Sequence, residues 1–90
     1  MFKYTPSVLE KLETLLEEAN YVVRYEKGNF KAGYCVLKDK RVIVVNKYYN
    51  TESRINCFLE LVPKLDLHED AMSEASHKLL KQIKAPAEQS

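Results

Sequence analysis

Apolar and polar residues follow two different periods along this chain, and the two periods divide it into helical and extended segments. Between residues 6 and 19 apolar side chains recur at helical spacing, at Val8, Leu9, Leu12, Leu15, Leu16 and Ala19. Residues 21–26, 33–38 and 41–47 are rich in β-branched and aromatic types, which predicts three strands. Only Asp39 and Lys40 separate the last two strands, so these strands are expected to form a hairpin.

The ends of the first helix carry capping residues. Ser7 and Glu10 have the spacing of a capping box, and Thr5 before Pro6 is an alternative start. Asn20 can end the helix in the left-handed conformation.

Two further helices are predicted in the second half of the chain. Asn50 and Thr51 are N-cap candidates for a helix that Pro63 ends or kinks. Its apolar stripe is Ile55, Phe58, Leu59 and Val62. Residues 70–84 form the third helix, with a buried stripe of Met72, Ala75, Leu79 and Ile83.

The strand at residues 41–47 is apolar on both faces. Val42 and Val44 point one way, and Ile43 and Val45 point the other. A sheet that helices cover on one side only should alternate apolar with polar residues. We therefore expect this strand to be covered on both sides, or to meet something else, such as a partner subunit, with its second face.

The element order predicts an α+β fold with a three-stranded antiparallel sheet and three helices, in the order α-β-β-β-α-α. One domain is expected over residues 1–90, with 85–90 as a flexible tail. Two strand orders fit the pattern. A meander would leave the apolar strand at an edge, where it could pair with a second copy, whereas a central position would bury it better.

Composition and charge narrow the class of protein. Fourteen basic residues face thirteen acidic ones, for a net charge of +1, which argues against a protein built to neutralise phosphates. The N-terminal segment has no apolar run of leader type, and the longest apolar stretch, Val42 to Val45, is too short to cross a bilayer. We expect a cytoplasmic protein with no membrane association, in which Cys35 and Cys57 are reduced.

The stretch GYCVLKDKRVIVVNKYYNTESRINCFLEL resembles the core of the ImmA/IrrE-type metallopeptidases. In that core, a glycine-led strand and a hairpin are followed by an apolar strand ending in Asn, and then by an Arg-led helix with HExxH. The resemblance covers about residues 21–65, and its matching positions are Gly33, Asn46, Arg54 and Glu60.

The resemblance fails at the catalytic motif. When Glu60 is placed on the catalytic Glu, Leu59 and Pro63 fall where the zinc-binding histidines belong. Two histidines on one helix face hold the metal, and the Glu between them polarises its bound water. Since Leu and Pro cannot ligate zinc, the resemblance implies a degenerate motif without an active centre. An unrelated domain with the same common hairpin–helix pattern is the alternative.

Other catalytic and metal chemistry finds little support in the residue pattern. The cysteines and histidines that could bind zinc are Cys35, Cys57, His68 and His77. None of them has the CxxC, HxxxH or CxxH spacing of a structural zinc site. Asp70, Glu74 and His77 share one face of the third predicted helix and could hold a cation or act as acid and base, but a solvated helix face has the same pattern. There is no GxSxG motif, and two glycines in the chain are too few for a phosphate-binding loop.

Basic and aromatic residues are interleaved around the predicted sheet, a pattern that nucleic-acid platforms share with ordinary strand edges. The residues are Lys27, Lys31, Lys38, Lys40, Arg41 and Lys47, with Tyr25, Phe30, Tyr34, Tyr48 and Tyr49.

The leading hypothesis is a non-enzymatic domain that needs no cofactor and acts through protein–protein contacts, as a homodimer. Candidate contact residues are Val42, Val44, Tyr48 and Tyr49. One alternative is a metal-dependent hydrolase related to the zinc peptidases, with a metal site that the spacing does not reveal. The other is a nucleic-acid-binding module.

Overall fold

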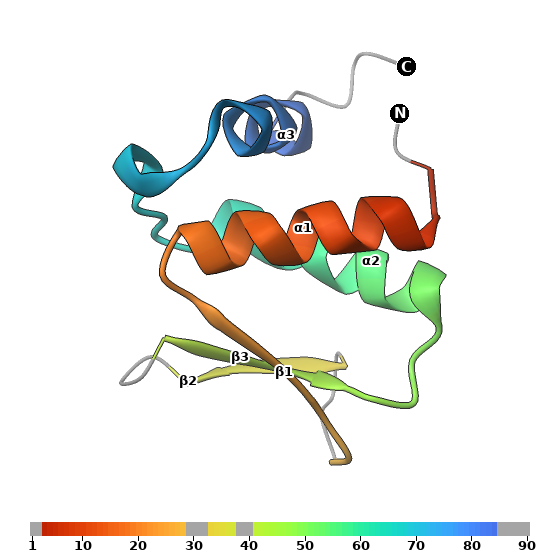
Figure 1. The fold of residues 1–90 in the computed structure, drawn as a ribbon. Helices are drawn as coiled ribbons and strands as arrows, with labels where there is room; N and C mark the ends of the chain where they lie inside the picture. The colour runs from red at the N-terminus through yellow and green to blue at the C-terminus, as the bar shows by residue number, and fades with distance from the viewer. Residues whose placement is uncertain (1–2, 29–32, 38–40, 85–90) are drawn as a thin grey trace.

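All the helices lie on one side of the sheet in the computed structural model, which describes residues 3–28, 33–37 and 41–84 (Figure 1). The helices are α1 (Pro6–Glu18), α2 (Thr51–Leu61) and α3 (Glu74–Lys84). The sheet contains β1 (Val22–Glu26), β2 (Tyr34–Leu37) and β3 (Val42–Asn46). Two short 3-10 turns, η1 (Val62–Lys64) and η2 (Glu69–Ala71), connect α2 to α3. The α+β class and the element order are therefore confirmed.

The sheet is mixed, so the prediction of an antiparallel sheet was wrong. The strand order is β1-β3-β2, with β1 parallel and β2 antiparallel to β3. The pairing of β2 with β3 confirms the predicted hairpin, although its turn at residues 39–40 lies outside the described residues. The most apolar strand therefore lies in the centre, as in the second of the two predicted orders, and hydrogen-bonds on both sides.

Side-chain caps define where α1 and α2 begin. Thr5 Oγ1 accepts a hydrogen bond from the Val8 N–H at 3.3 Å, so the helix starts at Pro6 and the Ser7 capping box was wrong. Asn20 follows α1 with a φ of 73°, which confirms the left-handed ending. Asn50 Oδ1 accepts the Ser53 N–H at 2.8 Å and caps α2.

The third helix is shorter than predicted. Residues 69–71 form a 3-10 turn and Met72 is extended, so α3 begins at Glu74 rather than at residue 70. Ser73 ends the connector, and its hydroxyl accepts the Ser76 N–H at 3.2 Å. This cap at Ser73 favours a helix that begins at Glu74 over one that begins at residue 70. Of the predicted stripe, Met72 is buried and Leu79 and Ile83 pack against the core, whereas Ala75 is exposed. The buried residues of α3 itself are Ser76 and Leu80.

The core lies between the helices and one face of the sheet. Its fully buried members are Leu12, Leu15, Leu16, Ile43, Val45, Ile55, Phe58 and Val62. The helix-facing half of β3 therefore supplies Ile43 and Val45 to the core cluster. The other half of the same strand, Val42 and Val44, does not belong to it.

Candidate functional site

One face of the sheet is covered by α1 and α2, α3 packs against α1 on the side away from the sheet, and no described element lies over the other face (Figure 1). Alternate residues of each strand pack against the core, namely Val23, Tyr25, Tyr34, Val36, Ile43 and Val45. The remaining residues of the strands form what we call the open face: Val22, Arg24, Glu26, Cys35, Leu37, Val42, Val44 and Asn46.

The strand register assembles an apolar row across the open face. Val42 of β3 is paired with Val22 of β1 on one side and with Leu37 of β2 on the other. Val22 is 52% exposed and Leu37 is 49% exposed, whereas Val42 between them is 8% exposed. Three aliphatic side chains from three strands thus lie side by side on a surface that no described helix covers.

A second row crosses the same face one pleat further along. Val44 is paired with Arg24 of β1 and with Cys35 of β2. Arg24 Nη2 lies 2.6 Å from Glu26 Oε2, and both side chains are exposed. The open face therefore has an aliphatic centre and, along β1, one positive and one negative group next to each other.

The two tyrosines proposed as contact residues differ in their surroundings. Tyr48 is 68% exposed, and Lys47 Nζ lies 5.6 Å from the centre of its ring. Tyr49 is half-buried, and its ring occupies the space that a Cβ at Gly33 would need. Gly33 has a φ of 84°, which a residue with a side chain adopts only with strain. Tyr49 therefore has a packing role in addition to the contact role that sequence predicts for it.

Arg54, a matching position of the peptidase resemblance, holds the loop before α2. Its Nε donates to the Tyr49 carbonyl at 2.8 Å and its Nη2 donates to the Lys47 carbonyl at 2.7 Å. Its guanidinium lies over the Tyr25 ring, 4.3 Å from the centroid. The Tyr25 hydroxyl donates to Glu13 of α1, and burial, together with this carboxylate, raises the pKa of Tyr25. Arg54 thus connects the loop to the core through Tyr25.

The three residues of the degenerate motif point to different environments. Leu59 packs against the core, whereas Glu60 and Pro63 are exposed, Pro63 within η1. Glu60 accepts a hydrogen bond from the Tyr34 hydroxyl at 3.3 Å. Burial, and then the charge of Glu60, raises the pKa of Tyr34.

A shallow hollow of about 320 Å³ lies beside Glu60 on α2, lined also by Tyr49, Ser53, Asn56 and Cys57. Burial raises the pKa of the Cys57 thiol, and the charge of Glu60 adds to the effect. A raised pKa leaves less of the nucleophilic thiolate, so the environment suits a structural cysteine better than a reactive one.

Within residues 3–28, 33–37 and 41–84, no three His, Cys, Asp or Glu side chains form a group that could hold a metal ion. Asp70 lies in η2, before α3, so the helix face that it was predicted to share with Glu74 and His77 does not form. Instead, His77 Nδ1 lies 3.9 Å from Glu69 Oε1.

The interleaved basic and aromatic residues are only partly described, since Phe30, Lys31, Lys38 and Lys40 lie outside the described residues. The Arg41 side chain makes its contacts within the protein. Its guanidinium lies 4.4 Å from the centre of the Tyr21 ring, and its Nη2 donates to the Asp66 carbonyl at 3.1 Å and to the Ala19 carbonyl at 3.4 Å. A side chain held in this way ties the end of α1 to the connector that follows η1.

Comparison with known proteins gives no relative: no family model, curated protein or solved structure matches this chain. No helix in the described part of the chain is both long and apolar enough to span a membrane. The geometry of the open face is therefore the main guide to function.

The sequence predicted the central residues of the open face, Val42 and Val44, but not the residues on either side of them. Val42 and Val44 stand out because their strand is apolar on both sides. Val22 and Leu37 lie in segments where apolar residues are adjacent, so the sequence alone did not tell which of them face outward. A signal was present in β1: with Val23 and Tyr25 inward, strict alternation places Val22 outward beside Arg24.

Proposed function

We propose that this protein acts through protein–protein contact, and that its open face binds the open face of a second copy. The observation that supports the proposal is the aliphatic row Val22–Val42–Leu37, which no described element covers. Val22 and Leu37 are exposed on either side of the buried Val42, and an exposed apolar patch is typical of an interaction site.

Two features favour a second copy as the occupant. The net charge of +1 gives two copies little overall repulsion. The opposite charges of Arg24 and Glu26 lie next to each other, so a two-fold axis between the pairs would bring each charge against its opposite in the second copy. A surface of one sign would repel its own copy.

The size of the open face sets the strength of this contact. A sheet of three strands with at most five residues each spans about 14 Å by 17 Å. Stable interfaces bury roughly 800 Å² on each partner, so contact through this face alone is small. We therefore expect a weak dimer, with a dissociation constant of about 10 μM or higher.

Sedimentation velocity from about 20 to 500 μM tests the proposal, a range that brackets a weak dimer. The wild-type average mass should rise from 10.5 kDa towards twice that value. The variant Val22→Lys/Leu37→Lys, which adds charge at two exposed positions, should remain monomeric. Tyr4→Lys changes an equally exposed apolar residue near the start of α1 and should behave as the wild type.

Two outcomes would contradict the proposal. One is a wild-type protein that stays monomeric over the whole range. The other is a double variant that associates as strongly as the wild type while its circular dichroism spectrum shows an intact fold. In the second case the copies would meet through another surface.

A further inference from the structure

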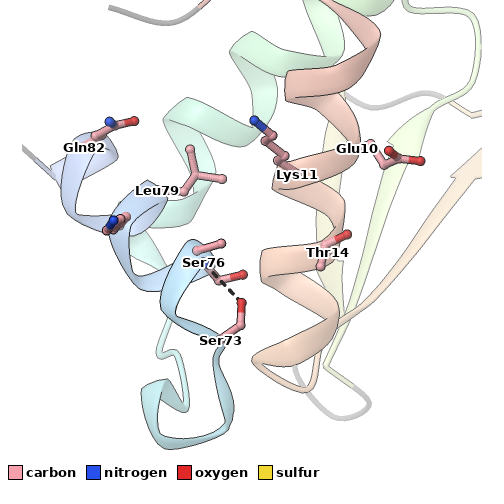
Figure 2. A pocket seen from close by; sticks show the side chains of 9 residues that line it. Glu10, Lys11, Thr14, Ser73, Ser76, Leu79 and Gln82 are labelled. Atoms are coloured by element: carbon pink, nitrogen blue, oxygen red, sulfur yellow. Dashed lines mark hydrogen bonds between the residues drawn. The ribbon is translucent and has the colours of Figure 1, made fainter.

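A second surface feature lies on the helical side of the molecule, where α1 and α3 run beside each other (Figure 2). It is a groove of about 450 Å³, and none of its residues belongs to the open face. The groove is lined by Glu10, Lys11, Thr14, Ser73, Ala75, Ser76, Lys78, Leu79 and Gln82. Its volume falls within the range of pockets that hold small organic ligands.

The charged residues that line the groove are two lysines and one glutamate. Lys11 contributes from the α1 wall and Lys78 from the α3 wall. Figure 2 shows the Lys11 side chain reaching into the space between the helices, whereas Glu10 points to the other side of α1. Two lysines against one glutamate give the lining a net positive charge, which favours an anionic ligand.

The groove also offers apolar contact. Leu79 is half-buried and points into the space between the two helices in Figure 2, and Ala75 lies one turn before it. The methylene stems of Lys11 and Lys78 extend this apolar surface, because lysine keeps only its terminal charge in water.

The start of α3 does not by itself supply the anion-binding group. The Ser73 N–H already donates to Glu18 Oε1 at 2.8 Å, and the Ser76 N–H donates to the Ser73 hydroxyl. The lysines, and not the helix terminus, therefore determine which ligands the groove favours.

We propose that the groove between α1 and α3 binds a small organic anion, with an apolar body against Leu79 and an acidic group within reach of Lys11 and Lys78. This proposal is independent of self-association, because the groove and the open face belong to different layers of the fold.

Anilinonaphthalene sulfonate, an aromatic body with one anionic group, is a suitable probe. Titration of the ¹⁵N-labelled protein should give saturable amide shifts at Thr14, Ala75 and Leu79. Phenylnaphthylamine, a neutral compound with the same aromatic body, should bind more weakly because it lacks the group that the lysines attract.

A matched pair of variants separates the lysines of the groove from charge in general. Lys11→Gln/Lys78→Gln should weaken binding of the sulfonate about three- to tenfold, as expected for the loss of two exposed charge contacts. Lys81→Gln/Lys84→Gln makes the same change of charge on α3 outside the groove, and should leave the affinity within about twofold of the wild type.

Three results would overturn the proposal. They are the absence of saturable binding, shifts that map to the open face instead of the groove, and equal affinities for the two double variants. Unchanged spectra of both variants without ligand would show that the fold is intact in each comparison.

Discussion

At the scale of single residues, the contact between Tyr49 and Gly33 fixes the loop that leads from β3 into α2. The ring lies where any Cβ at residue 33 would be, and the backbone there is left-handed. Arg54 secures the same loop by binding the Tyr49 carbonyl. Tyr48, between these anchored positions and β3, remains exposed.

Gly33→Ala should lower the free energy of unfolding by about 2 kcal/mol or more, because the methyl group meets the Tyr49 ring and the positive φ is strained. Gly28→Ala is the control, since Gly28 is exposed and does not have a positive φ. Urea unfolding of both variants measures the difference. Equal stability of the two variants would contradict this account of Gly33.

The sequence could not reveal this contact. In the sequence, Gly33 stands out as one of two glycines and as a position of the peptidase resemblance, and Tyr49 as a candidate contact residue, but neither points to the other. Their proximity depends on β2 lying beside β3 with a particular register, which places Tyr34 opposite Val45. The Tyr49 ring, which is distant in sequence, is what requires a glycine at residue 33. The residues next to Gly33 therefore do not reveal this requirement.

At the scale of the elements, Glu18 joins the end of α1 to the start of α3. Its carboxylate accepts the Ser73 N–H, and the hydroxyl of Ser76 adds a second hydrogen bond. These bonds lower the pKa of Glu18, with the backbone bond as the largest cause. The carboxylate thus acts as a tertiary cap that holds α3 against α1.

Because the pKa of Glu18 is lower in the folded protein, its stabilising effect is complete above the unfolded pKa of about 4.3 and is lost as the pH falls through the folded pKa. Because the Glu18 carboxylate is open to solvent, which screens its charge, Glu18→Gln should cost only about 0.5 kcal/mol at pH 7, the low end for a lost cap. The difference from the wild type should shrink in acid. Glu17→Gln, at an exposed neighbour, should cost little, and urea unfolding at several pH values compares the variants.

A Glu18→Gln penalty that stays constant down to pH 3, or that equals the Glu17→Gln penalty, would contradict the capping role.

Sequence patterns predicted the elements far better than the arrangement of the strands. The apolar faces of β3 indicate a central strand, yet nothing local to β1 shows that it runs parallel to β3. Parallel pairing is a property of the whole chain path, in which β2 crosses to the far side of β3. The start of α3 was missed for a local reason, since the Ser73 cap wins over the preceding acidic residues.

Hydrogen exchange tests the strand order. A central β3 should show slow exchange at consecutive amides from Val42 to Asn46, because its N–H groups alternate between two neighbouring strands. The edge strand β1 should show protection at alternate positions only. Consecutive protection in β2, with alternation in β3, would instead indicate a meander.

At the scale of the whole molecule, the helices lie on one side of the sheet, and no described element covers its other face. The helix side buries half of β3 in the core, while Val42 and Val44 belong to the open face. That face is small for a stable interface, so the protein should exist as monomer and dimer in an equilibrium that concentration controls.

The most direct test of this account is a concentration series of ¹⁵N–¹H spectra, from about 20 μM to 1 mM, a range that brackets a weak dimer. If two copies meet through the open face, amide shifts should change progressively at Val22, Leu37, Val42 and Val44, while α1 and α3 stay unchanged. Spectra that do not change with concentration, or changes confined to the helices, would contradict the central claim that the open face binds a second copy.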